Sequence, residues 1–170
     1  QGTNFSSNES EYNAILNMIE GKGSKRKLNY KIWFVCQGAS FNNDQGEKYL
    51  FAPEKDKKGN PKYYWSNVSK IKKGDVIVNY SHGIQGISIA KKDAYSGKNP
   101  HPQELWQNDG WKVDLDFHSL QPNIQYKEFN NYSQQLIKNL ANIKGPIQTN
   151  GGVKQGYLFE FNFESIRIIR

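Results

Sequence analysis

Two tryptophans lie in polar parts of the chain, where a flat ring could serve as a stacking surface. Trp65 lies between a charged loop and two short apolar runs, and Trp106 lies in the polar, proline-containing segment 93–110. A nucleobase stacked on an aromatic side chain gains about 1 to 3 kcal/mol. We therefore take Trp65 as the first candidate ligand contact. For Trp106, a stacking surface, a hydrophobic lid on the core and a protein contact are all open.

Lysine-rich turns offer a second kind of chemistry, the binding of phosphate groups. The loop around Gly59-Asn60-Pro61 is predicted to be a mobile turn able to lie along a sugar–phosphate backbone. The chain has 23 basic and 16 acidic residues and a formal net charge of +7. This balance favours a polyanionic partner, although lysines that only solvate loops would produce it too. The candidate phosphate-binding residues are Lys55, Lys57, Lys58, Lys62, Lys70, Lys72, Lys73 and Lys154.

The patterns that usually accompany catalysis or metal binding are missing from the sequence. Cys36 lies in an apolar run without a patterned histidine partner, which favours a core residue over a nucleophile. His82, His101 and His118 are scattered and show no metal-ligand spacing. The stretch that begins at Asn150 lacks the Lys-Ser/Thr ending of a phosphate-binding loop. We therefore expect a binding domain rather than an enzyme, with no metal and no cofactor.

Apolar periodicity predicts the elements that hold these residues. Predicted strands are 30–37, 76–80, 84–90, 111–117 and 157–163, and predicted helices are 9–20 and 132–143. The strands 76–80 and 84–90 are predicted to form a hairpin, and 30–37 is predicted to be a central strand buried on both faces. Segments 41–62, 93–110 and 122–131 are predicted to be connections. The pattern indicates an α+β fold, a small mixed or antiparallel β-barrel of five to six strands flanked by helices.

Length and composition predict one cytoplasmic domain. A chain of 170 residues suits a single domain, and an aromatic content of 14% predicts a core of few, large side chains. A single cysteine fits a reducing compartment. Neither a signal peptide nor an apolar run of about 18 residues is visible, so we expect a soluble protein. Residues 1–28 are predicted to be a helix and a basic linker, and residues 29–170 the domain, which we expect to be one module of a longer protein.

Five motifs in a fixed order carry a resemblance to a known family. IWFVCQG, IKKGDVIVNY, GISIAKKDAY, WKVDLDF and NGGVKQGYLFEF resemble the EVE domain, a PUA-like domain related to the YTH domains. The pattern is most similar to the EVE-type specificity domain of McrB-family restriction GTPases, over about residues 29–168. The resemblance implies a reader that flips a methylated or hydroxymethylated base of DNA into an aromatic cage and targets a restriction nuclease. It also implies an AAA+ GTPase or nuclease domain as a partner.

The resemblance assigns roles to particular residues. Trp65 matches the tryptophan that forms one cage wall, and Trp106, or alternatively Trp111, supplies the second wall. The remaining predicted base-binding residues are Cys36, Gln37, Gly38, Ser66, Asn67 and Asn150. The YTH motif Lys-Ser-Asn is absent at 36–38, which leaves 5-methylcytosine, 6-methyladenine and bulkier modified cytosines open. Other interpretations are a YTH-like reader of methylated RNA, an enzyme of the PUA-like group and a protein-interaction domain.

Overall fold

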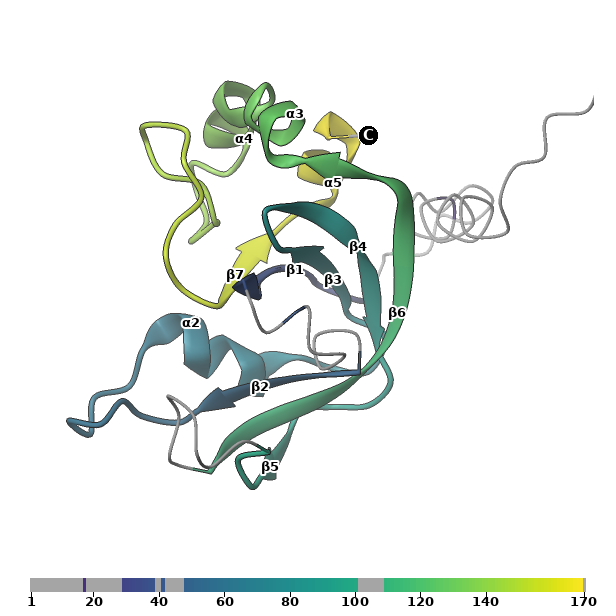
Figure 1. Ribbon diagram of the computed structural model, residues 1–170. Helices are drawn as coiled ribbons and strands as arrows, with labels where there is room; N and C mark the ends of the chain where they lie inside the picture. The colour runs from purple at the N-terminus through teal and green to yellow at the C-terminus, as the bar shows by residue number, and fades with distance from the viewer. Residues whose placement is uncertain (1–16, 18–28, 39–40, 42–47, 101–108, 170) are drawn as a thin grey trace, which may run out of the picture.

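The computed structural model describes residues 17, 29–38, 41, 48–100 and 109–169. Within these ranges the chain forms a strongly curled sheet with short helices at both ends (Figure 1). Trp106, His101 and, apart from Asn17, the predicted helix 9–20 and its basic linker lie outside the described residues. The division into residues 1–28 and 29–170 therefore stays a prediction. Among the described helices, none combines the length and the apolar character needed to cross a membrane.

The sheet is mixed, which confirms the predicted α+β class. The strands are β1 (Ile32–Cys36), β2 (Tyr49–Pro53), β3 (Val76–Tyr80), β4 (Gly83–Ala90), β5 (Tyr95–Gly97), β6 (Gly110–Gln125) and β7 (Leu158–Phe161). Their order is β2-β6-β4-β3-β1-β7, with β5 paired to β6. The pair β1 and β3 is parallel and the other pairs are antiparallel. The described helices are α2 (Tyr63–Ser66), the 3-10 helix η2 (Asn67–Lys70), α3 (Tyr126–Asn130), α4 (Ser133–Asn139) and α5 (Phe163–Ile168).

Strand β1 is buried on both faces, as its apolar run predicts. Alternate side chains along a strand point to opposite faces of the sheet. Phe34 packs in a core under α3, α4 and α5, which we call the helical core. Trp33 and Val35 pack in a second core beside β2 and η2, which we call the β2 core. Because β1 contributes side chains to both cores, the C-terminal end of this strand has a fixed position relative to each core.

The hairpin of β3 and β4 is confirmed, whereas the predicted connection 122–131 is wrong. Strand β6 continues to Gln125 and α3 follows directly, so β6 runs along the whole curled sheet (Figure 1). Proline is rarely found at the centre of a strand. The sequence pattern therefore offered no reason to extend the predicted strand 111–117 through Pro122. Here the register between β4 and β6 shifts between Ile84 and Gly86, and β6 accommodates its proline at this irregularity.

Two other predicted connections contain short strands. Segment 41–62 includes β2, which pairs with the first part of β6, and segment 93–110 includes β5. The strand β2 has only five residues, so its apolar side chains form too short a run for the alternation of a strand to be recognised in the sequence. Both strands are held by β6 and do not depend on a strong local pattern.

The C-terminal boundaries also differ from the prediction. Helix α4 is shorter than the predicted helix 132–143, and its N-cap, Tyr132, makes no side-chain capping hydrogen bond. The last strand ends at Phe161, where Asn162 accepts a hydrogen bond from the Ser165 N–H and begins α5. An asparagine at this position is a common helix start. The alternating aromatic residues concealed that signal.

Candidate nucleic-acid interface

Several of the predicted base-binding residues are joined through the start of β7. The N–H of Cys36, at the end of β1, donates to the Tyr157 carbonyl at 2.8 Å. The side-chain amide of Asn67 donates to the carbonyl of the next residue, Leu158, at 3.0 Å. Two adjacent peptide groups therefore connect the end of β1 with the segment that carries Trp65. Residues 36–38 and 65–67, which are about 30 positions apart in the sequence, belong to one end of the sheet.

Gln37 is held in place by a buried chain of polar side chains. It is 6% exposed, and its Oε1 accepts a hydrogen bond from Asn79 Nδ2 at 2.9 Å. The Oδ1 of Asn79 accepts from Ser88 Oγ at 2.7 Å, and both of these residues are fully buried. Such a chain orients each amide, because a reversed amide would leave a buried donor or acceptor unsatisfied. The sequence analysis did not include Asn79 and Ser88 among the site residues. A polar residue within an apolar strand could have indicated them.

Gly38 is tied to the β3–β4 hairpin. Its carbonyl accepts a hydrogen bond from Ser81 Oγ at 2.9 Å, and its φ of 50° lies in the left-handed region that favours glycine. The next hairpin residue, His82, is exposed and has a φ of 55°. The hairpin and the end of β1 thus form one edge, on which Gly38 and His82 are exposed and Gln37 and Ser81 are buried.

Trp65 and Trp111 pack against the same core. Both indoles are half-buried on the β2 core, Trp65 from α2 and Trp111 from β6. The Trp65 ring meets Tyr64 edge-on, with centroids 5.8 Å apart and planes at 85°. Of the two residues predicted as the second wall, Trp111 lies on the same side of the sheet as Trp65. The other, Trp106, lies outside the described residues.

Cys36 is placed as a packing residue. The thiol is half-buried beside the helical core, and burial raises its pKa to about 12. Burial, followed by the neighbouring Cys36, also raises the pKa of Tyr80 to about 12. Both groups therefore stay protonated near neutral pH, and a protonated thiol is a weak nucleophile. Across the described ranges, no three His, Cys, Asp or Glu side chains are grouped as a metal site would require.

Seven of the eight predicted phosphate-binding lysines fall into three environments, and Lys154 lies in a separate turn. Lys55, Lys57 and Lys58 are exposed around a turn in which Asp56 Oδ1 accepts the N–H groups of Lys58 and Asn60. Those contacts, the Asn60 N–H first, hold the pKa of Asp56 below its usual range. Asp56 also forms an ion pair with Lys62 at 3.2 Å. The Asp56 carboxylate therefore stabilises the turn through these contacts, and Lys55, Lys57 and Lys58 lie exposed on it.

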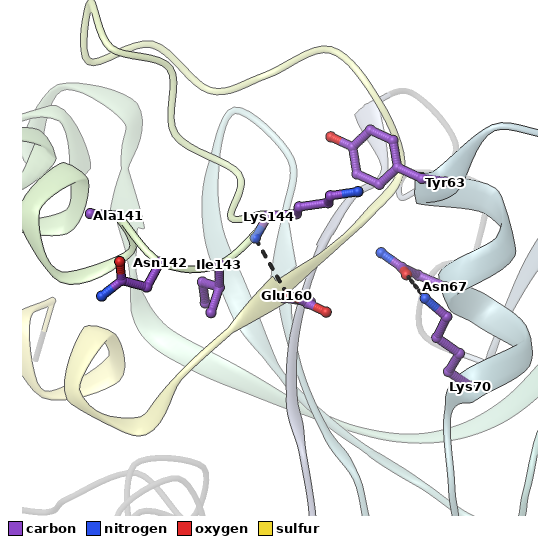
Figure 2. A pocket seen from close by; sticks show the side chains of 8 residues that line it. All are labelled: Tyr63, Asn67, Lys70, Ala141, Asn142, Ile143, Lys144 and Glu160. Carbon is purple, nitrogen blue, oxygen red and sulfur yellow. Dashed lines mark hydrogen bonds between the residues drawn. The ribbon is translucent and has the colours of Figure 1, made fainter.

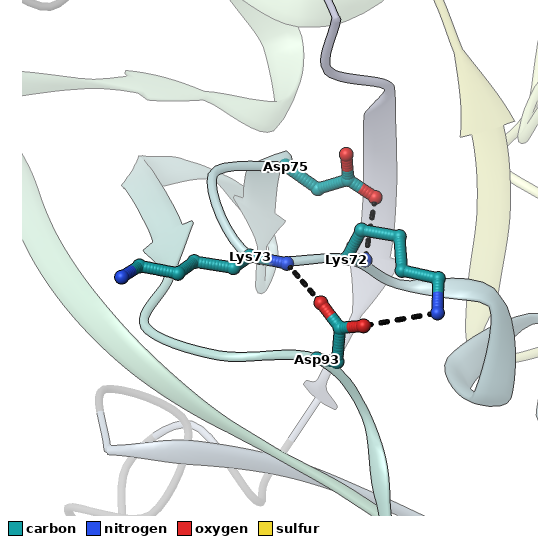
Figure 3. A network of polar contacts seen from close by, with 4 residues as sticks. All are labelled: Lys72, Lys73, Asp75 and Asp93. Atoms are coloured by element: carbon teal, nitrogen blue, oxygen red, sulfur yellow. Dashed lines mark hydrogen bonds and ion pairs between the residues drawn. The ribbon is translucent and has the colours of Figure 1, made fainter.

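The Lys72–Asp75 turn forms a second environment (Figure 3). Asp75 is buried and accepts the N–H groups of Lys31 and Lys72 and the Nε1–H of Trp33. The exposed Asp93 accepts Lys73 N–H at 2.9 Å and Lys72 Nζ at 3.0 Å, which together lower its pKa. A phosphate at Lys72 would have to compete with this carboxylate.

The third environment is a groove between α2–η2, segment 141–144 and β7, which we call the Tyr63 groove (Figure 2). It encloses about 500 Å³ and is lined by Asn67 and Lys70 of the predicted set, together with Tyr63, which the prediction omitted. Asn67 is buried and its amide is engaged with Leu158 and Lys70. Trp65 is not among the lining residues.

Asn150 and Lys154 lie in a self-contained turn. The Oδ1 of Asn150 accepts the Gly152 N–H at 3.0 Å, and Ile147 and Val153 form a bridge around it. Lys154 Nζ donates to the Gly145 carbonyl at 2.8 Å. Both predicted ligand contacts thus have structural partners within residues 145–154.

Comparison with known proteins places the fold. A scan against family models finds no match to the sequence, and a search of curated proteins finds none. Among solved structures, human THYN1 protein in complex with DNA containing 5-methylcytosine aligns with a TM-score of 0.51, at 17% identity over 82% of this chain and 95% of that chain. The two proteins share a fold. This likeness supports the predicted fold class, a curled mixed sheet with a few helices.

Two bacterial proteins align over a similar length. Rpa0253 from Rhodopseudomonas palustris has a TM-score of 0.49 and 11% identity, over 82% of this chain and 90% of its own. Atu2648 from Agrobacterium tumefaciens has a TM-score of 0.47 and 15% identity, over 82% and 91%. These scores are too low to add a functional argument.

Proposed function

We propose that this domain binds DNA carrying a modified base and holds that base, flipped out of the duplex, against Trp65. The observation that carries the proposal is the junction at Tyr157–Leu158, which joins the polar end of β1 to the segment bearing Trp65. Gln37, oriented by Asn79, would contact the base edge, and Trp111 or Trp106 would supply the second wall. The shared fold with THYN1, whose crystal structure contains 5-methylcytosine DNA, supports modified DNA as the ligand class.

The energetics set the expected selectivity. Extruding a base costs a few kcal/mol, and each stacked ring returns about 1 to 3 kcal/mol, so two rings roughly offset the flip. Net affinity must therefore come from phosphate contacts, and binding should weaken steeply with salt. A methyl group that fills an apolar pocket adds on the order of 1 to 3 kcal/mol. We expect about tenfold to hundredfold preference for modified DNA.

The biological role in the proposal rests on the resemblance to EVE-type domains of McrB-family systems. A selective but non-catalytic domain would direct a restriction NTPase or nuclease domain to modified DNA in the cytoplasm. The raised pKa of Cys36 supports the absence of a thiol nucleophile from this surface. Turnover of any nucleic acid by the isolated domain would contradict this part of the proposal.

The test is a binding titration with matched variants. Fluorescence anisotropy would compare hemi-modified, fully modified and unmodified duplexes for the wild type, Trp65→Ala and Trp65→Phe. We expect Trp65→Ala to reduce the modified-to-unmodified affinity ratio to near one, and Trp65→Phe to retain part of it. The control is Tyr126→Ala, which removes a ring that is 48% exposed on α3 and does not pack on the β2 core.

Two results would overturn the proposal. An affinity ratio that is the same in wild type and Trp65→Ala, with both proteins folded by circular dichroism, would remove Trp65 from the site. Equal or tighter binding of RNA carrying the same modified base would favour the RNA-reader interpretation instead.

A further inference from the structure

The Tyr63 groove combines an aromatic ring with two ammonium groups. Tyr63 is 41% exposed, one of two large apolar side chains this exposed in the described ranges. Its ring meets Tyr64 at 5.2 Å and Phe159 at 6.1 Å, both near edge-on. Lys144 Nζ lies 5.4 Å from its centroid. The ring is therefore held by two edge-on aromatic contacts, and the Lys144 side chain reaches toward it across the groove (Figure 2).

The two ammonium groups come from opposite walls of the groove. Lys70 lies on η2 and donates to the neutral Oδ1 of Asn67 at 2.9 Å, and Lys144 lies on the segment after α4. Within the described residues, neither forms an ion pair with a carboxylate, although Lys62, Lys72 and Lys92 do so. An anionic group between Lys70 and Lys144 would gain charge-assisted hydrogen bonds without displacing an acidic partner.

The floor of the groove carries a hydrogen-bond acceptor. Glu160 on β7 accepts the Lys144 N–H with its Oε2 at 3.3 Å, and its side chain points into the groove between the two walls (Figure 2). A carboxylate accepts hydrogen bonds at both oxygens. A ligand that suits all of these groups has an anionic group, a planar ring and an amino donor, which is the chemistry of a nucleotide.

The groove and the proposed base site are both carried by α2, where Tyr63 lines the groove and Trp65 packs on the β2 core. Tyr63, Tyr64 and Trp65 follow one another on α2, with centroid separations of 5.2 and 5.8 Å. A strand whose modified base rests on Trp65 would pass a neighbouring nucleotide along α2. Aromatic rows with nearby lysines are typical of surfaces that bind single-stranded nucleic acid.

We propose that the Tyr63 groove binds a nucleotide that flanks the recognised base, with its phosphate between Lys70 and Lys144 and its base on Tyr63. This inference rests on the proposed function, which supplies the strand. It adds a second contact site that is independent of the modification. A flanking contact raises the affinity for modified and unmodified DNA equally, because the neighbouring nucleotide is the same in both.

A truncation cycle tests the flanking contact. Oligonucleotides with and without the nucleotides on each side of the target base are titrated with the wild type, Tyr63→Ala and Tyr63→Phe. We expect truncation on one side to weaken wild type and Tyr63→Phe by about fivefold to a hundredfold, as for one lost stack. Tyr63→Ala is expected to lose less affinity on the same truncation, because only the phosphate contact is then left to lose. Equal losses in wild type and Tyr63→Ala would overturn the inference.

The lysine pair is tested by salt dependence. Each phosphate contact to duplex DNA contributes about 0.9 to the slope of log affinity against log salt. Lys70→Gln with Lys144→Gln is therefore expected to reduce the ratio of affinities at 50 and 200 mM salt by about 3.5-fold, the value of the one phosphate that the two lysines share. Lys92→Gln is the matched control, because its ammonium also lies over a tyrosine ring, Tyr95, and is paired with Asp114. A loss no larger than that of the control would overturn the phosphate assignment.

The outcomes separate this inference from the proposed function. Groove variants are expected to leave the modified-to-unmodified ratio unchanged, whereas Trp65→Ala changes it. If the wild type shows no such ratio, the proposed function fails, and the truncation cycle on unmodified strands still tests the groove. A free mononucleotide that binds as tightly as the strand would overturn the flanking assignment and identify a free-nucleotide site.

Discussion

The Lys72–Asp75 turn and the Tyr63 groove both present lysines but differ in what those lysines face. In the turn, the Lys72 ammonium is bound by Asp93, and the turn itself is built on the buried Asp75 (Figure 3). In the groove, the ammonium groups of Lys70 and Lys144 face a neutral amide and an aromatic ring, and the Glu160 carboxylate accepts the Lys144 backbone N–H (Figure 2). The turn pairs one of its two ammonium groups with a carboxylate, whereas neither ammonium group of the groove forms such an ion pair in the described residues.

This difference decides which lysines contribute to binding. Two unit charges about 4 Å apart in water attract by about 1 kcal/mol. A phosphate that approaches Lys72 exchanges one carboxylate for another anion and gains little, whereas a phosphate between Lys70 and Lys144 displaces no anion. Net charge alone therefore overstates the number of lysines available to DNA.

The largest effect is expected from Asp75→Ala. The carboxylate of Asp75 is 2% exposed and accepts three N–H groups, from Lys31, Lys72 and Trp33. Hydrogen bonds to a charged group contribute about 1.5 to 3 kcal/mol each, so we expect a loss of at least about 3 kcal/mol in the free energy of unfolding. Urea denaturation followed by tryptophan fluorescence would measure it.

The control for this prediction lies in the same turn. Asp93 is exposed, and Asp93→Ala is expected to leave the urea midpoint nearly unchanged. A similar loss in both variants would show that the turn does not depend on its buried carboxylate, and the contrast between an internally satisfied turn and an open groove would lose its basis.

A smaller effect is expected when the lysine pairs of the two regions are exchanged for glutamine. Lys72→Gln with Lys73→Gln is expected to reduce the ratio of DNA affinities at 50 and 200 mM salt by less than the groove pair does. Asp93 already binds the Lys72 ammonium, and of these two lysines only Lys73 is without a carboxylate partner for its ammonium group in the described residues. The groove pair is expected to reduce the same ratio by about 3.5-fold, the value of one phosphate contact. Anisotropy titrations on one unmodified duplex would rank them, and a larger loss for the turn pair would reverse the comparison.

Sequence patterns predicted the central elements because burial there is unambiguous. The apolar run of β1 and the hairpin of β3 and β4 have a period or a continuity that only a buried strand explains. The predicted end of β6 was wrong because Pro122 is tolerated at an irregularity in its pairing with β4, which depends on the partner strand. Local sequence carries no information about that pairing.

The site was less predictable because its contacts join distant residues. Asp75 reads as part of a surface turn, yet its partner Trp33 is 42 residues away. Tyr63 and Trp65 are two positions apart on a helix of four residues, and so short a helix has no apolar period to show which ring faces the groove. Asn67 has the residue type of a ligand contact, but its amide serves the fold.

The smallest effect is expected from Asp93→Asn, which probes the turn without disturbing its fold. Contacts from the Lys73 N–H, followed by the Lys72 ammonium, lower the pKa of Asp93 below the value of about 3.9 in an unfolded chain. Its contribution to stability is therefore fully present above about pH 4 and is lost as the pH falls through the folded-state pKa.

Wild type and Asp93→Asn should consequently show parallel stability curves from pH 5 to 8 and converge only in stronger acid. At pH 7 the substitution frees the Lys72 ammonium, so the salt slope of DNA binding is expected to steepen by up to about 0.9. Thermal unfolding across the pH series and anisotropy at two salt concentrations would measure both effects. An unchanged slope would mean that Lys72 does not reach a phosphate even when unpaired, which would assign the lysines of this turn to the fold alone.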